Sequence, residues 1–349
     1  EVLQRNLMTL PAQQKVRVDD LRFLLGMIAG VGEGPGRNAL YQLLEVGTDT
    51  DRQREALQLL ARGMTQGVDR DNLRREIDKL TSSERPHPIQ DDLLLLRATL
   101  ALGDSDFITA EDKAQMLLDH FPASTLKPYA LGLLADAAWE QQHYRTAADY
   151  AKQTQLALSS DSRNIEVRKR LSAVIAEAWF RARDYRNAAD AYTSVILNPP
   201  SGIALGDLIF QRVESEIMAV EAGTGSLKAA ENALDQSSKI PAFDAMHRWQ
   251  AEWNLARALQ LSGKPFDAYT RITSLLNQTD ARSDLPIDLR ARMAWLQARL
   301  AVDARDLGQA LKLVDSLGGI LNGVNLDLRQ DLLSSSLLLK AQIYFDQKK

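Results

Sequence analysis

Histidine is the residue of this chain best suited to hold a transition metal, because there is no cysteine to supply a thiolate. Metal sites on helices use ligands three or four residues apart, or ligands that the fold brings together. His87, His120, His143 and His247 are all farther apart than that in sequence. The spacing therefore predicts no metal site, unless the fold assembles one from distant residues.

Two short acidic motifs begin like calcium-binding loops. Asp49-Thr-Asp51 and Asp104-Ser-Asp106 each place two carboxylates two residues apart. Both lack the glycine at the sixth position and the terminal glutamate that complete such a loop. An aspartate just before a helix accepts hydrogen bonds from its first amides, so we predict that both motifs are helix caps.

The glycine-rich segment Gly30-Val-Gly-Glu-Gly-Pro-Gly36 overlaps the pattern of a phosphate-binding loop. Such loops need a strand before them and a helix N-terminus after them, so that several amides converge on the anion. Here Leu21–Ala29 favours a helix capped by Asp19 or Asp20, no P-loop lysine follows, and Pro35 has no N–H to donate. We therefore predict a connecting loop and no nucleotide cofactor.

The remaining chemistry of the sequence points away from several protein classes. No Ser/His/Asp set or paired-acid motif can be assembled from spacing, so the chain is not predicted to be an enzyme, although active sites can assemble in space. The net charge of −4, from 42 basic and 46 acidic residues, gives no basic footprint for nucleic acid. No apolar run approaches the roughly 20 residues of a transmembrane helix.

Leucine and alanine dominate the apolar residues, which favours helices over strands. Residues 128–158 read as two helices joined by a tight turn. Ala135 and Ala138 on the first helix, with Ala147 and Ala151 on the second, are small enough for two antiparallel helices to cross at about 8 Å. Such a pair has an outer apolar face that it cannot bury alone, so it requires neighbouring pairs.

A repeat of such pairs is visible in the spacing of one small residue early in each second helix. Ala147, Ala188, Ala230, Ala268 and Ala310 are separated by 41, 42, 38 and 42 residues. Periods of this size indicate a helical solenoid. We expect a helical N-terminal segment at residues 1–85, then a repeat array of about six pairs at residues 86–349. Gly318, Gly319 and Gly323 are expected to interrupt the array before a truncated last repeat.

These residues resemble the tetratricopeptide repeat. The second helix of that family opens on an aromatic residue with alanine three residues later, as in Tyr144/Ala147 and Tyr185/Ala188. Further matches are a later aromatic, the turn glycines and the small residue of the first helix, found here at Tyr192, Gly225, Gly263, Ala135, Ala176, Ala256 and Ala298. The family's usual period is 34 and its tryptophan lies earlier in the first helix, so this array departs from it in both respects.

The resemblance implies an all-α, right-handed α-solenoid of antiparallel helix pairs, a superhelix with an inner face lined by the first helices. In that pattern the inner-face positions are Tyr129, Asp136, Trp139, Glu140, Arg170, Glu177, Phe180, Arg181, Trp253, Arg257, Gln260, Trp295 and Arg299. A face that mixes aromatic, arginine and acidic residues suits an extended peptide or a partner helix. A plain solvated face, with Trp179, Trp249 and Trp253 in the core, is the alternative.

The expected function is non-catalytic protein binding, as a scaffold or adaptor. The segment Phe121-Pro122-Ala-Ser124 resembles bacterial envelope proteins of the family, which implies a periplasmic or outer-membrane-associated location, with the cytoplasm as the alternative. Two other functions stay open: a self-assembling structural module, including a homo-oligomer, and the regulatory arm of a longer enzyme or transcription regulator. Because the chain starts at Glu1 and ends just after another repeat begins, we expect a piece of a longer protein.

Overall fold

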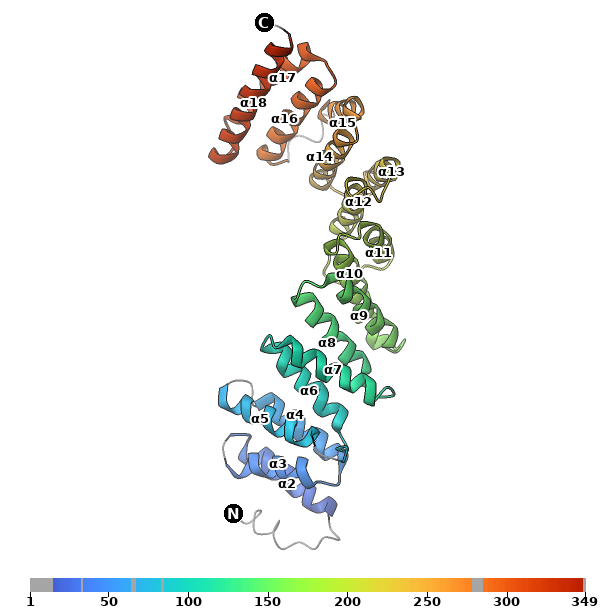
Figure 1. The fold of residues 1–349 in the computed structure, drawn as a ribbon, viewed down its shortest axis with the longest axis vertical. Helices are drawn as coiled ribbons and strands as arrows, with labels where there is room; N and C mark the ends of the chain where they lie inside the picture. The colour runs from blue at the N-terminus through green and yellow to red at the C-terminus, as the bar shows by residue number, and fades with distance from the viewer. Residues whose placement is uncertain (1–14, 33, 64–66, 83–84, 278–284, 348–349) are drawn as a thin grey trace. The chain divides into compact units, whose positions relative to one another are not determined.

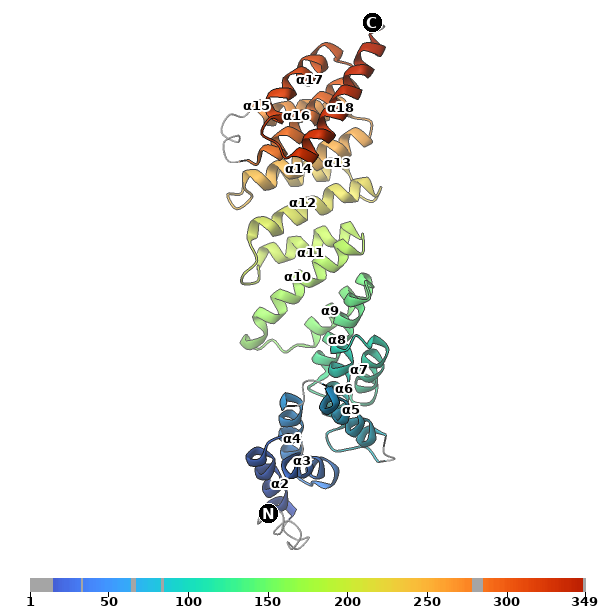
Figure 2. The ribbon, with the colours of Figure 1, turned by 90° about the vertical axis from the view of Figure 1, so that its left-hand side faces the viewer.

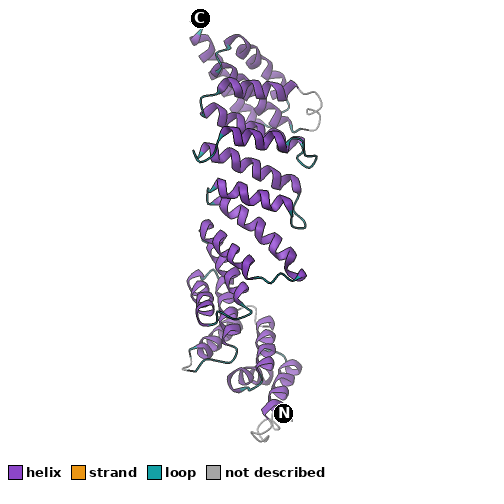
Figure 3. Ribbon diagram, turned by 90° about the vertical axis from the view of Figure 1, so that its right-hand side faces the viewer, coloured by secondary structure: helices purple, strands orange, loops and turns teal. Residues whose placement is uncertain are grey.

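The computed structural model describes residues 15–32, 34–63, 67–82, 85–277 and 285–347. Within these ranges the chain is built of α-helices, one short 3-10 helix (Ser162–Asn164) and loops, and it contains no strand (Figure 3). The prediction of an all-α fold is therefore confirmed. None of the described helices has an apolar stretch long enough to cross a membrane.

The contacts within the chain divide it into two units, Glu1–Ser160 and Asp161–Lys349. The first unit contains α2 (Lys15–Ala29), α3 (Pro35–Val46), α4 (Thr50–Gly63), α5 (Gly67–Thr81), α6 (Gln90–Gly103), α7 (Phe107–His120), α8 (Lys127–Glu140) and α9 (Tyr144–Ala157). Helices α6/α7 and α8/α9 form regular antiparallel pairs (Figure 1). Our expected boundary at residues 85 and 86 concerns where the regular repeat begins, and it stays a prediction.

The second unit continues the pairing with longer first helices. It contains α10 (Ile165–Arg181), α11 (Tyr185–Leu197), α12 (Leu205–Glu221), α13 (Leu227–Ser237), α14 (Ala245–Leu261), α15 (Pro265–Asn277), α16 (Ile287–Asp303), α17 (Leu307–Leu321) and α18 (Leu326–Asp346). Each even-numbered helix up to α16 packs against the odd-numbered helix that follows it (Figure 2). The predicted array of antiparallel helix pairs is therefore confirmed, and α18 follows the last pair.

Small residues lie where the two helices of each pair meet, as the spacing predicted. The five alanines at positions 147, 188, 230, 268 and 310 are at most 1% exposed. Ala310 packs with Ala298, Ala301 and Val314 in one apolar cluster at the α16–α17 contact. A larger side chain at these positions would force the helix axes apart. The alanine repeat therefore sets the distance between the helices.

Every first helix from α6 to α16 ends in the same turn. One residue after the helix cap has a positive φ, and the residue after that donates its N–H to a carbonyl five positions earlier, as Asp306 does to Ala301 at 2.9 Å. This is the Schellman arrangement, which satisfies carbonyls that the helix end leaves free. The positive-φ residues are Ser105, Gln142, Arg183, Gly223, Gly263 and Arg305.

Aspartates at the helix starts have the capping role that we predicted. Asp106 accepts the N–H of Thr109 at the start of α7, and Asp49 accepts the N–H groups of Asp51 and Arg52 in α4. Both acidic motifs that begin like calcium loops are therefore caps. The carboxylates of Asp49 and Asp106 are used by backbone donors, which explains their place in the sequence.

The prediction for Asp19 was wrong. Helix α2 begins at Lys15, so Asp19 lies within it and is 1% exposed. Its carboxylate accepts the N–H groups of Thr48 at 2.7 Å and Asp49 at 3.0 Å. A buried carboxylate needs hydrogen-bond donors, and the turn before α4 supplies them. Asp19 therefore fixes a contact between distant segments and caps no helix of its own.

The prediction that Gly318 and Gly319 interrupt a helix was also wrong. Both lie inside α17, which continues to Leu321. Glycine within a helix costs about 1 kcal/mol relative to alanine. Leu317 and Leu321, on either side of the glycines, are only 1% and 2% exposed, and the burial of two leucines contributes more than that cost.

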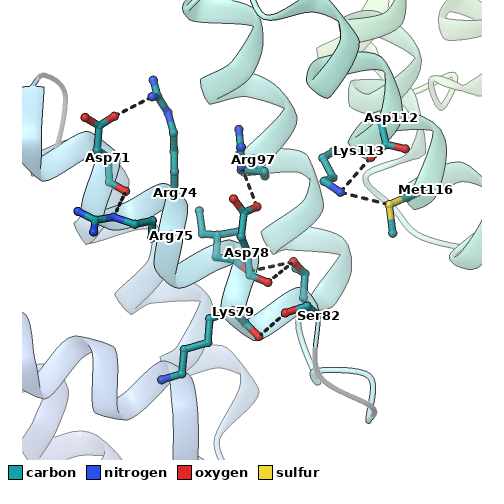
Figure 4. Close-up of polar contacts among 12 residues, drawn as sticks. Asp71, Arg74, Arg75, Asp78, Lys79, Ser82, Arg97, Asp112, Lys113 and Met116 are labelled. Carbon is teal, nitrogen blue, oxygen red and sulfur yellow. Dashed lines mark hydrogen bonds and ion pairs between the residues drawn. The ribbon is translucent and has the colours of Figure 1, made fainter.

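Polar contacts join neighbouring helices in the first unit (Figure 4). Arg97 of α6 donates through Nε to Asp78 Oδ1 of α5 at 2.9 Å. Arg74 of α5 pairs with Asp71 one turn earlier and with Asp104 just beyond α6. These ion pairs lie at the surface, where each contributes at most about 1 kcal/mol. The apolar cluster centred on Leu40, Leu60, Ile77 and Leu93 contributes the main stabilisation.

Candidate functional site

The predicted inner-face residues lie on four first helices, α8 in the first unit and α10, α14 and α16 in the second. None of the thirteen is fully buried. Because these side chains repeat on the same kind of helix, each unit presents a face of mixed aromatic and charged groups. That this face binds a partner stays a prediction.

On α8, the aromatic residues differ in their exposure and in their ring contacts. Tyr129 is 62% exposed. The ring of Trp139 packs edge-on against Tyr144 at a centroid distance of 5.4 Å, which ties the end of α8 to the start of α9. Asp136 is partly desolvated and faces the carboxylate of Glu140, and both effects raise the pKa of its carboxyl. The face of α8 therefore combines one free ring with a pair of acids.

On α10, Glu177 is the centre of a small polar network. It accepts a hydrogen bond from Arg181 Nε at 2.7 Å and another from Tyr192 Oη at 2.8 Å. Phe180 packs edge-on against Tyr185 at 5.4 Å, as Trp139 does against Tyr144. The network and the ring contact fix the end of α10 against α11. Arg170 lies about two turns before Glu177 on the same helix, and its Nε is 3.7 Å from Glu166 Oε1.

Helices α14 and α16 form a cleft of about 210 Å³ on the side of the second unit where Trp253 lies. Trp253 and Leu289 give it an apolar wall, and Arg292 and Gln250 add polar groups. Its complete lining is Met246, Gln250, Trp253, Pro286, Asp288, Leu289 and Arg292. The cleft has room for one large side chain, and its lining includes a cation, an acid and an amide.

Beyond the cleft, hydrogen bonds connect successive first helices along the same face. Gln260 of α14 donates to Asp303 of α16. Arg299 of α16 lies 3.4 Å from Asp303 and donates to Gln342 of α18 at 3.4 Å. Gln260 and Arg299 therefore both contact Asp303, and their place on a binding face stays a prediction. Trp295 has another role, because its ring packs among the apolar residues between α16 and its neighbours.

Helix α12 contributes a residue to this face that the repeat pattern missed. Glu214 Oε2 accepts a hydrogen bond from Asn254 Nδ2 of α14 at 2.7 Å. Burial raises the pKa of the Glu214 carboxyl, and the bond from Asn254 offsets part of that rise. The sequence feature that could have predicted this contact is an acid and an amide 40 residues apart, which is one repeat period, in two consecutive first helices.

The three tryptophans for which we considered a place in the core differ in their environment. Trp249 is 1% exposed and belongs to the main apolar cluster of the second unit. Trp179 packs partly buried against the cluster around Tyr192 and Val195. Trp253 also packs partly against the core, yet it lines the cleft. The core interpretation is therefore right for Trp249, and Trp253 serves both roles.

The glycine-rich segment adjoins a hollow of about 500 Å³ in the first unit, between α3 and α5. Helix α2 precedes the segment and α3 already begins at Pro35, so the strand required by a phosphate loop is not there. Arg37, in the hollow, donates through Nε to Val31 O at 2.8 Å and pairs with Asp69 at 2.8 Å. Its charge is already compensated, so the hollow has no free cation at Arg37 for an anion.

The histidine with acidic neighbours is His247 in the second unit. Its ring nitrogens lie 2.9 Å from Asp244 Oδ1 and 3.0 Å from Asp207 Oδ1, and the ring stacks on Phe243. This arrangement links the starts of α12 and α14. In the described part of the chain, no three His, Asp or Glu side chains are placed to hold a metal ion together.

Comparison with known proteins gives similarity in fold alone. No family model and no curated protein matches the sequence. The apo form of RapI is 11% identical with a TM-score of 0.41, covering 95% of this chain and 98% of that one. A tetratricopeptide repeat protein from Parabacteroides merdae is 13% identical with a TM-score of 0.36, covering 82% and 99%.

A third solved structure is NprR in complex with its cognate peptide NprX. It is 14% identical with a TM-score of 0.33, covering 87% of this chain and 86% of that one. With TM-scores below 0.5, none of these similarities is high enough to assign a ligand to this chain. The geometry of its own side chains carries the functional argument.

Proposed function

We propose that this protein is a non-catalytic binding scaffold that holds an extended segment or a helix of a partner protein on the first-helix face of residues 161–349. The cleft between α14 and α16 carries this proposal. It combines the partly exposed ring of Trp253 with Arg292 and Gln250. Aromatic and arginine residues dominate the energetics of protein interfaces.

The chemistry of the face indicates the kind of segment that would bind. An apolar or aromatic anchor of the partner fills the cleft against Trp253 and Leu289, where burial of one large side chain contributes about 1.5–3 kcal/mol. Arg257, which is exposed, and Arg292 lie on the same two helices. They attract acidic groups on either side of the anchor. A peptide with one aromatic residue next to acidic residues suits this face.

Selection of peptides from a random displayed library against the whole chain tests the proposal. We expect enrichment of aromatic-plus-acidic sequences, and we expect Trp253→Ala to weaken their binding by about 10–100-fold, the range for loss of a central anchor. Phe266→Ala is the matched control, because Phe266 is 67% exposed but lies on the second helix α15. Binding retained by a folded Trp253→Ala variant would contradict the proposal.

We also propose a bacterial envelope location, periplasmic or at the outer membrane. It is supported only by the resemblance of Phe121-Pro122-Ala-Ser124 at the end of α7 to envelope proteins of the tetratricopeptide family. Cell fractionation of the native-length protein tests it. Recovery in the periplasmic or outer-membrane fraction supports an envelope adaptor, and recovery in the cytoplasm contradicts it.

A further inference from the structure

A further hollow of the second unit lies on the side of α14 that points away from the cleft. Its volume is about 440 Å³, and residues of α13, α14 and α15 line it. Glu252 of this hollow follows Gln250 of the cleft by two residues, so their side chains point about 160° apart around the helix. We call the hollow the acidic groove, because two guanidinium groups and four carboxylates line it: those of Arg248, Arg271, Glu231, Asp235, Glu252 and Asp267.

One end of the acidic groove is electrically balanced. Arg271 donates to Glu252 at 2.6 and 3.0 Å and to Asp235 at 2.6 Å. Burial raises the pKa of the Glu252 carboxyl, and the charges of Arg271 and Arg248 offset part of that rise. Two guanidinium groups therefore compensate two carboxylates at this end, which needs no further ion.

The other two carboxylates lie level with each other at the opposite end of the groove. As second helices of successive pairs, α13 and α15 run in the same direction, and Ala230 and Ala268 are equivalent positions in them. Glu231 follows Ala230 and Asp267 precedes Ala268, so the two acids differ by two residues, about 3 Å along the helices. Among the residues that the structure describes, none forms a hydrogen bond or an ion pair with either carboxylate. This end therefore carries two uncompensated negative charges.

An aromatic ring lies beside these two carboxylates. Phe266 precedes Asp267, lines the groove and is 67% exposed. The helix pairing does not require a ring at this position, because the equivalent residues of α9, α11, α13 and α17 are Arg145, Arg186, Lys228 and Gly308. The face of a phenyl ring attracts cations, so the ring and the two acids favour the same kind of ligand.

We propose that the acidic groove binds an arginine side chain from a basic segment of a partner protein. The guanidinium group stacks on the ring of Phe266 and donates hydrogen bonds to Glu231 and Asp267. Arginine suits this combination because its planar, weakly hydrated group can stack on a ring and pair with carboxylates at the same time. The ammonium group of lysine is a compact, strongly hydrated charge that cannot stack in this way.

The remainder of the groove suits the peptide chain that carries this arginine. Thr270 and Ser274 are exposed and line the α15 wall between the two ends. Their hydroxyl groups can form hydrogen bonds with the backbone of an extended segment. A basic segment is attracted to this side of α14, whereas Arg257 and Arg292 attract acidic groups to the cleft side. The two sites select different partners, so either proposal can fail without the other.

Fluorescence anisotropy with a labelled nonapeptide of alternating arginine and glycine tests the proposal. We expect the whole chain to bind this probe at about 0.01 M salt and to bind it more weakly at about 0.15 M, because salt screens exposed charges. The lysine analogue should bind about 3–10-fold more weakly, since it loses the stacking. The citrulline analogue keeps the shape of arginine without its charge and should bind at least about tenfold more weakly.

Variants of the groove test the residues. Glu231→Gln with Asp267→Asn should weaken binding of the arginine peptide at least about tenfold, since both carboxylate partners are lost. Asp327→Asn with Asp331→Asn is the matched control, because it removes the same charge from exposed positions of α18, outside the groove. Phe266→Leu should weaken binding about 2–5-fold, the effect of one cation–π contact at an exposed site. Circular dichroism checks that each variant is folded.

Three outcomes would contradict the proposal. Equal binding of the arginine and citrulline peptides would overturn it, as would equal weakening by the groove variant and the α18 control, because the charges of the groove would then not be recognised. A lysine peptide that binds as tightly as the arginine peptide would overturn the stacking on Phe266. N-acetylarginine amide that binds as tightly as the peptide would overturn the assignment to a protein segment, in favour of a small guanidine.

Discussion

Tyr192 holds a carboxylate in place beneath the exposed surface of α10. Its hydroxyl donates to Glu177 Oε2 at 2.8 Å, and burial together with Glu177 raises the pKa of the phenol. Without this donor, Glu177 keeps the hydrogen bond from Arg181 at 2.7 Å. A hydrogen bond to a charged group stabilises a protein by about 1.5–3 kcal/mol, so we expect Tyr192→Phe to lower the free energy of unfolding by about that amount at neutral pH.

The same bond predicts a response to alkaline pH. The folded-state pKa of Tyr192 is raised, so above the ordinary tyrosine pKa of about 10 the unfolded chain releases this proton before the folded chain does. Stability from this group is therefore complete below about pH 10 and decreases as the pH rises further. Urea unfolding on both sides of that pH should show a smaller decrease for Tyr192→Phe than for wild type. Tyr129→Phe, on an exposed tyrosine, is the control.

The ion pair between Glu252 and Arg271 is a second residue-scale feature with a measurable effect. Glu252 is 4% exposed, and its carboxylate accepts two bonds from Arg271, at 2.6 and 3.0 Å. Glu252→Gln leaves the arginine with Asp235 as its remaining carboxylate partner, at 2.6 Å. We expect a loss of roughly 3 kcal/mol in the free energy of unfolding, as for other broken buried pairs.

A double variant measures how much the interaction between Glu252 and Arg271 contributes beyond the two separate residues. Glu252→Leu with Arg271→Met replaces both charges by apolar groups of similar volume, and we expect it to cost much less than Glu252→Gln alone. Equilibrium unfolding of Glu252→Leu, of Arg271→Met and of the double variant gives the coupling energy of the pair. A double variant that is as unstable as the sum of the single ones would show that the two charges act independently.

At the scale of elements, the turns after the first helices place L-residues where glycine would be more favourable. Arg183 has a φ of 58°, whereas Gly223 and Gly263 occupy the same position in the next two pairs with φ of 72° and 76°. A non-glycine residue in this region costs roughly 1–2 kcal/mol. Glycine loses about 0.5–1 kcal/mol more entropy on folding. We therefore expect Arg183→Gly to raise the free energy of unfolding by up to about 1 kcal/mol.

Two further variants isolate the backbone effect. Arg183→Ala removes the side chain but keeps the strained φ, so it should not reproduce the gain of Arg183→Gly. Gly263→Ala should lose about 1 kcal/mol, because nothing lies within 4 Å of the added methyl group and only the positive φ disfavours it. Thermal unfolding of the three variants checks this. A stabilised Arg183→Ala would assign the effect to the side chain.

The helices and their pairing could be predicted from sequence because helical periodicity and alanine spacing are local. The five repeated alanines predicted the crossings, and all five are buried. Asp19 could not be predicted, because its partners, the amides of Thr48 and Asp49, are about 30 residues away. Gly318 and Gly319 led to a wrong prediction of a helix interruption, because the low helix propensity of glycine is outweighed by the burial of Leu317 and Leu321.

The candidate site was predictable only in part, for the same reason. The repeat pattern predicts Trp253 and Arg257 as inner-face positions, since their positions follow from the register of one helix. The cleft beside Trp253 requires Leu289 and Arg292 of the next first helix, about 40 residues later. Met246 and Leu289 of its lining lie in the first turns of α14 and α16, and helix starts are the least certain part of a sequence prediction.

At the scale of the whole molecule, the contact groups 1–160 and 161–349 predict separate folding units. Between α9 and α10 the chain runs through Ser160, Ser162 and Arg163, all exposed. Exposed connections are preferred sites of proteolysis. We expect brief trypsin treatment to cut after Arg163 first and to yield two fragments that keep their helical circular dichroism.

The variant Arg163→Gln removes that cleavage site and should delay the appearance of both fragments without a change in thermal stability. Each purified fragment should also unfold cooperatively, because each unit has its own apolar clusters. A fragment of residues 164–349 that loses its helicity would contradict the division into two folding units.

The first helices of the second unit are longer than those of the repeats before them, and this has a consequence for how binding could arise. Helices α14 and α16 have 17 residues, and α6 and α8 have 14. Three residues are nearly one turn, and the added turn carries Met246 and Leu289, part of the cleft lining. The added turn therefore leaves the crossing alanines in register, and it adds binding surface at the start of each first helix. Specificity in such an array can be acquired one repeat at a time, by inserted turns that leave the stacking of its neighbours intact.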